Sequence, residues 1–432
     1  MIVTVAFRTL GCRLNQAETD AFKSELTKFN LREVSGSEPA NLTVINSCAV
    51  TRAAEAKTRA TITAARRISP NGKIAIVGCY SQLAAAELLD IPGVYLVLGN
   101  NEKYNLFDFL EEIDQGEKIV RVTTPGLAAT TFRAGYHSAL DLRIRVNLKI
   151  QEGCDYYCAY CILPYLRGAP RSREPQDCIA EIRQLTEQGV REIILTGINL
   201  GRYQSPEGDL AALIRRLLDE TTIPRIRLSS IEPDLITPQL IELIASEPRL
   251  CRYLHIPLQH GADTVLGLMK RHYQTADYAA LVDSIKQRMP EICIGADVMV
   301  GFPGETESEF EQMRRFIENI DITYLHVFRY SARPGTPAAD LGDHIPDSEK
   351  KRRSAILRQL SGRKRTQFMQ TFSGKVCPVL FEEKIATDTW QGLTDNYVKV
   401  RANSKEHLYN RIRKVRIIHV SGDFLKGELL SE

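Results

Sequence analysis

Three cysteines stand close together in the segment GCDYYCAYC, residues 153–161, with the spacing C-x3-C-x2-C. Thiolates from Cys154, Cys158 and Cys161 on one short loop can hold three irons of a four-iron, four-sulfur cluster. The fourth iron then has no protein ligand, and an open coordination position lets a metal centre bind a substrate. A zinc site with a fourth ligand elsewhere in the chain is the alternative. The segment therefore predicts a metal centre around which the rest of the chain has to fold.

The residues around this loop alternate between strand and helix patterns. Six strand candidates occur in order, and helical patterns lie between them, for example at 177–188, 209–220 and 275–288; the strands are 143–150, 192–195, 225–229, 253–257, 292–300 and 324–330. Six βα units predict a partial (β/α)6 barrel, short of the eight units that close a TIM barrel. Active sites of such barrels lie at the carboxyl ends of the strands. The cysteine loop directly follows the first of these strands.

A second cysteine triad precedes the barrel. Strand candidates at 3–9, 42–45, 73–77 and 94–98 alternate with helical patterns at 15–29, 51–67 and 83–89. This alternation predicts an α/β domain with a doubly wound parallel sheet. Cys12, Cys48 and Cys79 stand just past the carboxyl ends of three strands, which gather at one edge of such a sheet. We therefore expect these thiols to converge; three separate buried thiols are the alternative.

The rest of the chain divides into a connector and a small module. A basic helical pattern covers 347–369, and short alternating runs follow at 374–381, 391–401 and 415–420. These runs predict a small all-β module. The expected domains are 1–110 for the parallel-sheet domain, 111–138 for a connector, 139–365 for the barrel and 366–432 for the all-β module.

Composition excludes several classes of protein. The chain has 432 residues, a formal net charge of +3 and ten cysteines. We expect no signal peptide and no transmembrane helix, because no window is apolar over the roughly 18 residues that a span needs. We therefore expect a cytoplasmic protein with no membrane association, in which cysteines stay reduced and act as metal ligands, catalytic thiols or buried apolar residues. We expect Cys178, Cys251, Cys293 and Cys377 to be buried.

The cysteine motifs resemble a known family. The C-x3-C-x2-C spacing, the aromatic Tyr160 before the last cysteine and the position after the first barrel strand resemble the radical S-adenosylmethionine (SAM) superfamily. Residues 154–173, which continue as ILPYLRGAPRSR, resemble the methylthiotransferases within it. TLGCRLNQAETD around Cys12, NSCAVT around Cys48 and VGCY around Cys79 are similar to the three cluster-binding segments of that family. The resemblance covers essentially the whole chain and implies a cluster domain, a radical SAM barrel and an RNA-binding TRAM domain, in that order.

The resemblance also implies the cofactors and the chemistry. Cys154, Cys158 and Cys161 would bind a radical-generating 4Fe-4S cluster, and Cys12, Cys48 and Cys79 an auxiliary 4Fe-4S cluster that carries the sulfur. One SAM would methylate that sulfur. A second SAM would yield the radical that abstracts hydrogen from carbon 2 of an adenine, which then takes the methylthio group. The implied partners are the anticodon stem-loop of tRNA, a reducing protein such as flavodoxin or ferredoxin, and a sulfur donor.

The motifs also point to a branch of the family. TLGCRLNQ together with N-x-C-A-V-T resembles the branch that acts on N(6)-threonylcarbamoyladenosine at position 37 of tRNA. The isopentenyladenosine branch usually shows Y-G-C-Q-M-N, and the branch acting on a ribosomal-protein aspartate usually shows L-G-C-P-K-N; Arg13, Leu14 and Asn15 match neither. Both branches stay open as alternatives, as does a non-catalytic RNA-binding protein whose clusters sense redox state.

Polar residues and glycines at the strand ends are candidate SAM contacts. The set is Tyr160, Gly197, Asn199, Ser229, Glu232, Gln259, Arg271, Asp297 and Gly301. Tyr160 is included because the family usually binds the adenine of SAM through the backbone at this position, and Arg271 because guanidinium suits the methionine carboxylate. A plain turn glycine at Gly197, a helix cap at Ser229 and Glu232, and a surface arginine at Arg271 are the alternatives. His260, His272 and His326 are isolated in sequence and interpreted as structural.

Basic residues supply candidate RNA contacts, because phosphate neutralisation provides most sequence-independent affinity. The candidates are the helix from Lys350 to Arg365, the run Arg411, Arg413, Lys414 and Arg416, and Arg167, Arg171 and Arg173 beside the cysteine loop. A target base has to be flipped out of its stack, and Tyr157 or Tyr165 can stack on it. A solvated surface is the alternative for any such charge run.

Overall fold

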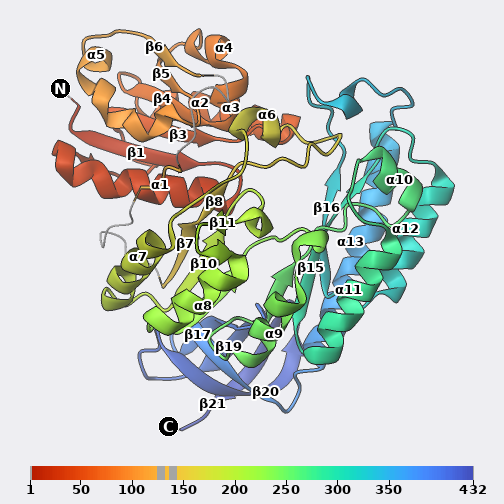
Figure 1. Ribbon diagram of the computed structural model, residues 1–432. Helices are drawn as coiled ribbons and strands as arrows, with labels where there is room; N and C mark the ends of the chain where they lie inside the picture. The colour runs from red at the N-terminus through yellow and green to blue at the C-terminus, as the bar shows by residue number, and fades with distance from the viewer. Residues whose placement is uncertain (1, 124–131, 136–143, 432) are drawn as a thin grey trace.

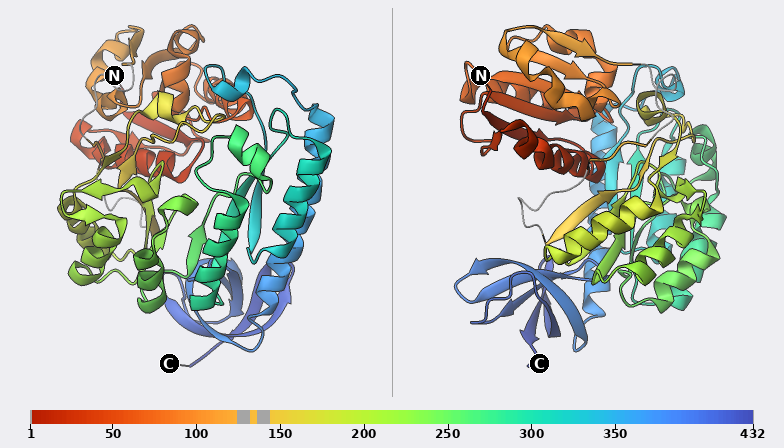
Figure 2. Two further views of the ribbon diagram at one scale, coloured as in Figure 1. Left: turned by 45° about the vertical axis from the view of Figure 1, so that its right-hand side comes forward. Right: turned by 60° about the vertical axis from the view of Figure 1, so that its left-hand side comes forward.

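The computed structural model describes residues 2–123, 132–135 and 144–431. The chain folds into a parallel-sheet domain, a partial barrel and a small closed β-barrel, in the predicted order (Figure 1). The first and the last of these lie at opposite ends of the central barrel, as both views in Figure 2 show. Among the described residues, no helix combines the length and the apolarity that a bilayer crossing requires.

The amino-terminal sheet is parallel, with the strand order β2-β1-β3-β4-β5-β6. Its strands are β1 (Thr4–Thr9), β2 (Arg32–Glu33), β3 (Leu42–Ser47), β4 (Lys73–Gly78), β5 (Val94–Leu98) and β6 (Ile119–Arg121). Its helices are α1 (Arg13–Glu25), η1 (Leu26–Phe29), α2 (Arg52–Ile68), α3 (Cys79–Leu83), α4 (Ala85–Leu89), η2 (Glu102–Phe109) and α5 (Leu110–Asp114). All six residues of β3 are buried because the strand lies inside the sheet and helices cover both faces.

Two sequence predictions for this domain need correction. The helix expected at 83–89 is only α4 (Ala85–Leu89), because Ala84, at φ −137°, separates it from α3, which ends at Leu83. Strands β2 and β6 are too short to show a pattern, and β6 pairs with β5 inside the stretch expected to be a connector. Residues 124–131 and 136–138 of that expected connector lie outside the described residues.

The central barrel has the six predicted strands, in spatial order as in sequence. They are β7 (Arg145–Lys149), β10 (Glu192–Thr196), β13 (Arg225–Leu228), β14 (Tyr253–His255), β15 (Cys293–Val300) and β16 (Tyr324–Arg329). Two parallel three-stranded sheets meet where β13 and β14 are joined by isolated bridges, Ile226 to Leu250 and Ser230 to His255. Leucine, isoleucine and valine side chains from strands and helices form one core around it.

Helices cover the outside of this barrel (Figure 1). They are α7 (Pro175–Glu187), α8 (Leu210–Glu220), α9 (Pro238–Ser246), α10 (Asp263–Leu268), α11 (Thr275–Arg288) and α12 (Glu307–Asn319), with η3 (Leu200–Arg202), η4 (Pro233–Leu235) and η5 (Pro337–Ala339). The short helix α6 (Leu163–Arg167) instead packs beside α3 of the amino-terminal domain. The short strands form two antiparallel pairs, β8 (Gln151–Glu152) with β9 (Arg171–Ser172) and β11 (Gln204–Ser205) with β12 (Gly208–Asp209).

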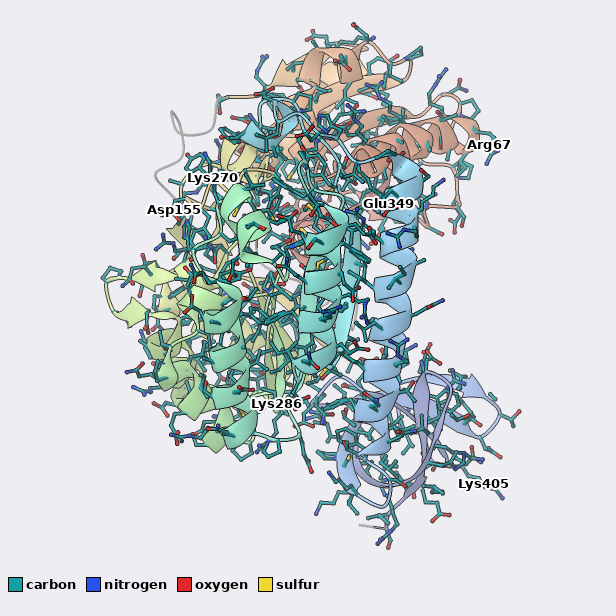
Figure 3. The ribbon with its side chains drawn as sticks, turned by 90° about the vertical axis from the view of Figure 1, so that its right-hand side faces the viewer. Arg67, Asp155, Lys270, Lys286, Glu349 and Lys405 are labelled. Atoms are coloured by element: carbon teal, nitrogen blue, oxygen red, sulfur yellow. The ribbon has the colours of Figure 1, made fainter. Side chains whose placement is uncertain are left out.

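The carboxyl-terminal module is a closed barrel with strand order β17-β18-β19-β21-β20. Its strands are β17 (Val376–Ala386), β18 (Thr389–Thr394), β19 (Lys399–Asn403), β20 (Ile412–Ser421) and β21 (Phe424–Leu429). The run expected at 391–401 is not one strand but a hairpin, because the chain reverses near Tyr397, which has a φ of 66°. Helix α13 (Asp347–Gln370) leads into this barrel and crosses the expected domain limit at 365, and Figure 3 shows it running from Glu349 down to the module that carries Lys405.

The two flanking domains contact opposite ends of the barrel strands. At the amino end of β13, Arg225 donates to the carbonyls of Pro378 and Leu393, and Arg227 to that of Asp395. At the carboxyl end of β7, Lys149 pairs with Glu18 of α1. The all-β module therefore covers the amino ends of the strands, and the amino-terminal domain faces the carboxyl ends, where the cysteine loop lies.

Candidate iron–sulfur and SAM site

The parallel sheet brings the first cysteine triad together. Cys12, Cys48 and Cys79 follow β1, β3 and β4, which are neighbours in the sheet. Gly11 has a φ of +101°, and a β-carbon there would lie 2.8 Å from the β-carbon of Cys48, so only glycine allows this approach. Burial first and the neighbouring Cys79 second raise the pKa of Cys48 to about 12. The predicted convergence of these three residues is thus present in the fold.

Arg167 connects this triad to the barrel. It ends α6, the short helix that follows the second triad, and it is 2% exposed. Its Nε donates to Sγ of Cys79 over 3.2 Å, and Nη2 donates to Oδ1 of Asn15 over 3.0 Å. A guanidinium has donors only, so Sγ of Cys79 accepts this hydrogen bond. A cationic donor directed at this sulfur fits a cysteine that is a ligand of a metal centre.

Two buried carboxylates complete the surroundings of Arg167. Nη1 donates to Glu18 and to Glu152, over 2.8 Å in each case. Lys103 lies 2.6 Å from Glu18, and Lys149 contacts both carboxylates. Burial alone would raise the pKa of Glu152, but Lys149 and then Arg167 hold it lowered to about 2. We call these five side chains the buried ion network.

The buried ion network corrects one prediction. Arg167 was expected to contact RNA, and burial excludes that role. Arg173 is 3% exposed and pairs with Glu181, so it is unsuited to it as well. Arg171 is partly exposed at the rim, where its Nη2 lies 3.6 Å from Glu152.

The second triad lies on the loop between β8 and α6. The backbone amide of Cys161 donates to the carbonyl of Cys158 over 2.9 Å, which curls the loop. Sγ of Cys158 accepts from Nη1 of Arg271 over 3.1 Å, and Sγ of Cys154 lies 3.7 Å from Nδ2 of Asn199. Burial first and then the neighbouring Cys158 raise the pKa of Cys161 to about 12. Three thiols on one curled loop, with donors directed at two of them, fit a cluster with three protein ligands.

A cavity of about 300 Å³ opens in front of this loop. All three cysteines of the loop line it, and so do Val50 and Thr51, which follow Cys48 of the other triad. Oδ1 of Asn199, on its wall, and the hydroxyl of the adjoining Tyr330 are buried and have no hydrogen-bond partner among the described residues. Unpaired buried polar atoms indicate a site made for a polar ligand.

The cavity gathers most of the predicted SAM contacts. Tyr160, Asn199, Glu232, Gln259, Arg271 and Asp297 line it. Gly197, Ser229 and Gly301 are not among its lining residues. Gly197 packs on Gln151, and Gly301 packs on Lys350, where a β-carbon would lie 2.3 Å from Cγ. Glycine is therefore required at these two positions because other side chains of the protein pack against them, and not because a ligand does.

Two lining residues show how the cavity is held. Arg271 is 9% exposed and forms an ion pair with Glu232, in addition to its bond to Cys158. Burial raises the pKa of Glu232 in spite of that arginine. Gln259 adopts a left-handed backbone with φ 62°, a strained state for a residue with a β-carbon, and such strain gathers at functional sites.

Sequence reasoning missed one group at the cavity edge. His326 was interpreted as isolated, but β15 and β16 place it directly opposite Asp297. Oδ1 of Asp297 accepts from Nδ1 of His326 over 3.2 Å and from Nε2 of His255 over 2.9 Å. Strand alternation puts the three residues on one face, but only the strand register reveals their pairing.

The basic candidates for RNA contact differ in exposure. Lys414 and Arg416 both lie on the outer face of β20. Arg411, which precedes the strand, is also exposed. Arg413 is 9% exposed and pairs with Glu406, so it does not share that surface. Tyr157 and Tyr165 are half-exposed beside the cysteine loop, with ring centroids 5.4 Å apart.

On α13, much of the expected positive charge is neutralised inside the protein. Arg352 pairs with Glu307 and Glu349, and Arg353 is buried against Glu305. Lys364 donates to the carbonyl of Ile320 over 2.7 Å. The helix therefore joins the barrel by ion pairs, and its contribution to an RNA-binding surface is smaller than its composition indicates.

Comparisons with known proteins agree with this architecture. The radical SAM superfamily model matches residues 148–317, and the model of the uncharacterized protein family UPF0004 matches residues 4–99. Among solved structures, the radical S-adenosylmethionine methyltransferase TsrM from Kitasatospora setae superposes with a TM-score of 0.57 at 17% identity, over 78% of this chain and 77% of that chain. The radical enzyme OxsB gives 0.53 at 12% identity over 83% and 55%. At such identities these likenesses describe the fold alone.

Relatives of higher identity cover nearly the full length. The threonylcarbamoyladenosine tRNA methylthiotransferase MtaB of Bacillus subtilis is 34% identical over 99% of this chain and 97% of its own. Its counterpart in Aquifex aeolicus is 34% identical over 95% and 99%. A tRNA-2-methylthio-N(6)-dimethylallyladenosine synthase of Anaplasma phagocytophilum is 29% identical over 98% and 97%. The fold, the two cysteine triads and these full-length relatives agree: the chain belongs to the radical SAM methylthiotransferase family.

Proposed function

We propose that this protein transfers a methylthio group to carbon 2 of N(6)-threonylcarbamoyladenosine at position 37 of tRNA, giving 2-methylthio-N(6)-threonylcarbamoyladenosine. The observation that carries the proposal is the shared cavity. Cys154, Cys158 and Cys161 line it together with Val50 and Thr51, which lie two and three residues after Cys48. A reaction that joins a radical to a sulfur needs both metal centres to reach one substrate atom.

The residues present fit the implied cofactors. Each triad offers three thiolates and thus leaves one iron of a 4Fe-4S cluster open. When bound, the clusters and SAM supply the radical that activates the carbon–hydrogen bond and the sulfur that replaces the hydrogen. The chain's own contribution is to hold these groups. Arg271 donates to Cys158, and Arg167 donates to Cys79.

The branch assignment rests on two supports. The segments around Cys12 and Cys48 resemble the threonylcarbamoyladenosine branch, and two of the full-length relatives that carry that name are 34% identical to this chain. The exposed Lys414 and Arg416 on the small β-barrel favour an RNA substrate over a protein. We further propose that the reaction takes place in the cytoplasm, with a flavodoxin or ferredoxin as electron source and a separate sulfur donor.

Nucleoside mass spectrometry of tRNA from a deletion strain tests the proposal. Loss of 2-methylthio-N(6)-threonylcarbamoyladenosine alone supports it. Loss of the methylthiolated isopentenyl nucleoside instead would assign the chain to the other tRNA branch. Loss of methylthio-aspartate from a ribosomal protein would make the substrate a protein.

A variant series tests the two centres separately. Cys12→Ala, Cys48→Ala and Cys79→Ala should each abolish methylthiolation but leave some reductive cleavage of SAM to 5′-deoxyadenosine. Cys178→Ala is the matched control, because Cys178 is buried in the barrel core on α7. Absence of 5′-deoxyadenosine from the reduced wild-type protein would favour a redox sensor, and full methylthiolation by the first three variants would refute the auxiliary centre.

A further inference from the structure

An ionised carboxylate stands between two imidazoles at the edge of the cavity. Both described hydrogen bonds to the carboxylate of Asp297, from His255 and His326, fall on Oδ1. The side chain of His255 is 6% exposed and that of His326 is 55% exposed, while Asp297 itself is 25% exposed. The two rings stack with centroids 5.1 Å apart. The histidines therefore fix the carboxylate, and among the described residues no hydrogen bond is directed at its second oxygen, Oδ2.

The hydrogen bonds also determine the charge of this group. Burial alone would raise the pKa of Asp297, but the bonds from His255 and then His326 hold it well below the ordinary range. An ionised carboxylate only accepts hydrogen bonds. What it can recognise is a ligand that presents N–H or O–H groups.

An exposed aromatic ring and a cation line the same cavity as this carboxylate. Phe328 is two residues beyond His326 on β16, on the same face of the strand, and is 45% exposed. Exposed aromatic rings are the surfaces on which proteins stack extruded bases. Arg329 follows and is also exposed, and both residues line the cavity together with Asp297 and the cysteine loop. A guanidinium suits a carboxylate group on the ligand.

We propose that Asp297, Phe328 and Arg329 form the subsite that recognises the target nucleobase. The adenine ring stacks on Phe328, an N–H of its N(6)-carbamoyl substituent donates to Asp297, and the carboxylate of that substituent meets Arg329. The proposal rests on the proposed function, since it takes a threonylcarbamoyl group as the substituent. It moves Asp297 from the expected SAM contacts to the substrate.

His255, Asp297 and His326 together have the composition of a divalent cation site. The ligand atoms of His255, Asp297 and His326 lie within 4.8 Å of one another. In the structure, however, the ring nitrogens of His255 and His326 that face Asp297 lie within hydrogen-bond distance of its Oδ1, at 2.9 and 3.2 Å, and so hold the carboxylate in place. We therefore assign His255 and His326 as positioning residues for the carboxylate, with metal content as part of the test.

Binding of three anticodon stem-loop RNAs to the full chain tests this subsite. The RNAs carry adenosine, N(6)-threonylcarbamoyladenosine or N(6)-isopentenyladenosine at the target position. Anisotropy is measured anaerobically on the reconstituted protein at one salt concentration. The variants are Asp297→Asn and Arg329→Gln. Asp283→Asn and Arg315→Gln, on the exposed surfaces of α11 and α12, are controls with the same charge changes.

The expected result is a loss of discrimination. Wild-type protein prefers the threonylcarbamoyl RNA over the unmodified RNA, and each of the two variants lowers this ratio by about tenfold, the value of one charge-assisted hydrogen bond. The control variants keep the wild-type ratio. The isopentenyl RNA lacks the carboxylate, so its binding does not respond to Arg329→Gln.

Three outcomes would overturn the subsite. The first is a wild-type preference for threonylcarbamoyl RNA that both variants retain. The second is a loss of SAM affinity in Asp297→Asn with the RNA preference intact, which would return Asp297 to the cofactor. The third is one equivalent of non-cluster metal that Asp297→Asn removes. A wild-type preference for the isopentenyl RNA is a different result, because it would refute the proposed branch before any variant is measured.

Discussion

Replacing Arg167 by methionine tests the buried ion network directly. Methionine has a similar length but removes the charge and every donor. Glu18 and Glu152 each lose a bond of 2.8 Å, Asn15 loses one of 3.0 Å, and Cys79 loses one of 3.2 Å.

The expected cost follows from what remains. Removing one partner of a buried ion pair destabilises a protein by about 3 to 5 kcal/mol. Lys103 and Lys149 still face the two carboxylates, so we expect the lower end, about 3 kcal/mol. For a domain the size of the central barrel, this loss of stability corresponds to a fall of roughly 10 °C in melting temperature. Arg167→Lys keeps the charge without the planar fork, so its melting temperature should lie between those of the wild type and Arg167→Met.

The assay is thermal melting of the cluster-free protein, monitored by circular dichroism. Arg202→Met is the control, because Arg202 pairs with Asp155 on the surface, where an ion pair contributes at most about 1 kcal/mol. In the reconstituted protein, a redox titration adds a second measure. Loss of the donor to Cys79 should lower the reduction potential of the auxiliary cluster and leave that of the radical cluster in place. Melting of Arg167→Met within the error of Arg202→Met, with both potentials unchanged, would refute the reasoning.

Three further predictions concern other parts of the chain. Gly11→Ala should reduce the iron content of reconstituted protein by about four atoms, because its new methyl group would lie 2.8 Å from the β-carbon of Cys48. Lys414→Glu combined with Arg416→Glu should weaken tRNA binding and reduce the dependence of log affinity on log salt by about two. The resistance to urea should fall as the pH drops from 4.5 towards about 2, because unfolded chains bind a proton at Glu152 that the folded protein excludes; Glu152→Gln should flatten this dependence.

Each of these predictions has its control. Gly116→Ala imposes a similar backbone strain, φ +97°, in open space and should leave iron content unchanged. Arg413→Gln removes a charge that Glu406 already neutralises and should leave the salt dependence unchanged. For the acid response, Glu309→Gln removes a carboxylate whose hydrogen bonds come from Thr264 and Thr306 near the surface, so it should change the slope less. If a variant and its control gave the same result, the corresponding prediction would be contradicted.

Local patterns were sufficient for most of the fold. The six barrel strands were predictable because strand and helix patterns alternate regularly along this part of the chain, and right-handed βα units allow few ways to connect them. The convergence of Cys12, Cys48 and Cys79 was predictable for the same reason, since carboxyl ends of neighbouring parallel strands share an edge. What was missed there, β2 and β6, is short and forms only because a longer strand offers an edge.

Charge placement was not predictable, because its partners are distant in sequence. An arginine beside a cluster loop is expected to face a polyanion, yet Arg167 is neutralised by Glu18, which is 149 residues away. Likewise, His326 acquires its partner Asp297 through strand register across 29 residues. In both cases the sequence contains the residue types, but tertiary contacts decide whether each charge is satisfied inside the protein or is available to a ligand.

The buried ion network also carries an electrostatic argument about cluster binding. Its nearly fully buried members are three cations, Lys103, Lys149 and Arg167, and two carboxylates, Glu18 and Glu152. One positive charge therefore remains, and the bond from Arg167 to Cys79 directs it at a cluster ligand. An excess charge in a buried site is costly unless an opposite charge balances it. A metal-bound thiolate supplies that charge, so loading the auxiliary centre should stabilise the contact between the amino-terminal domain and the barrel as well as the cluster site itself.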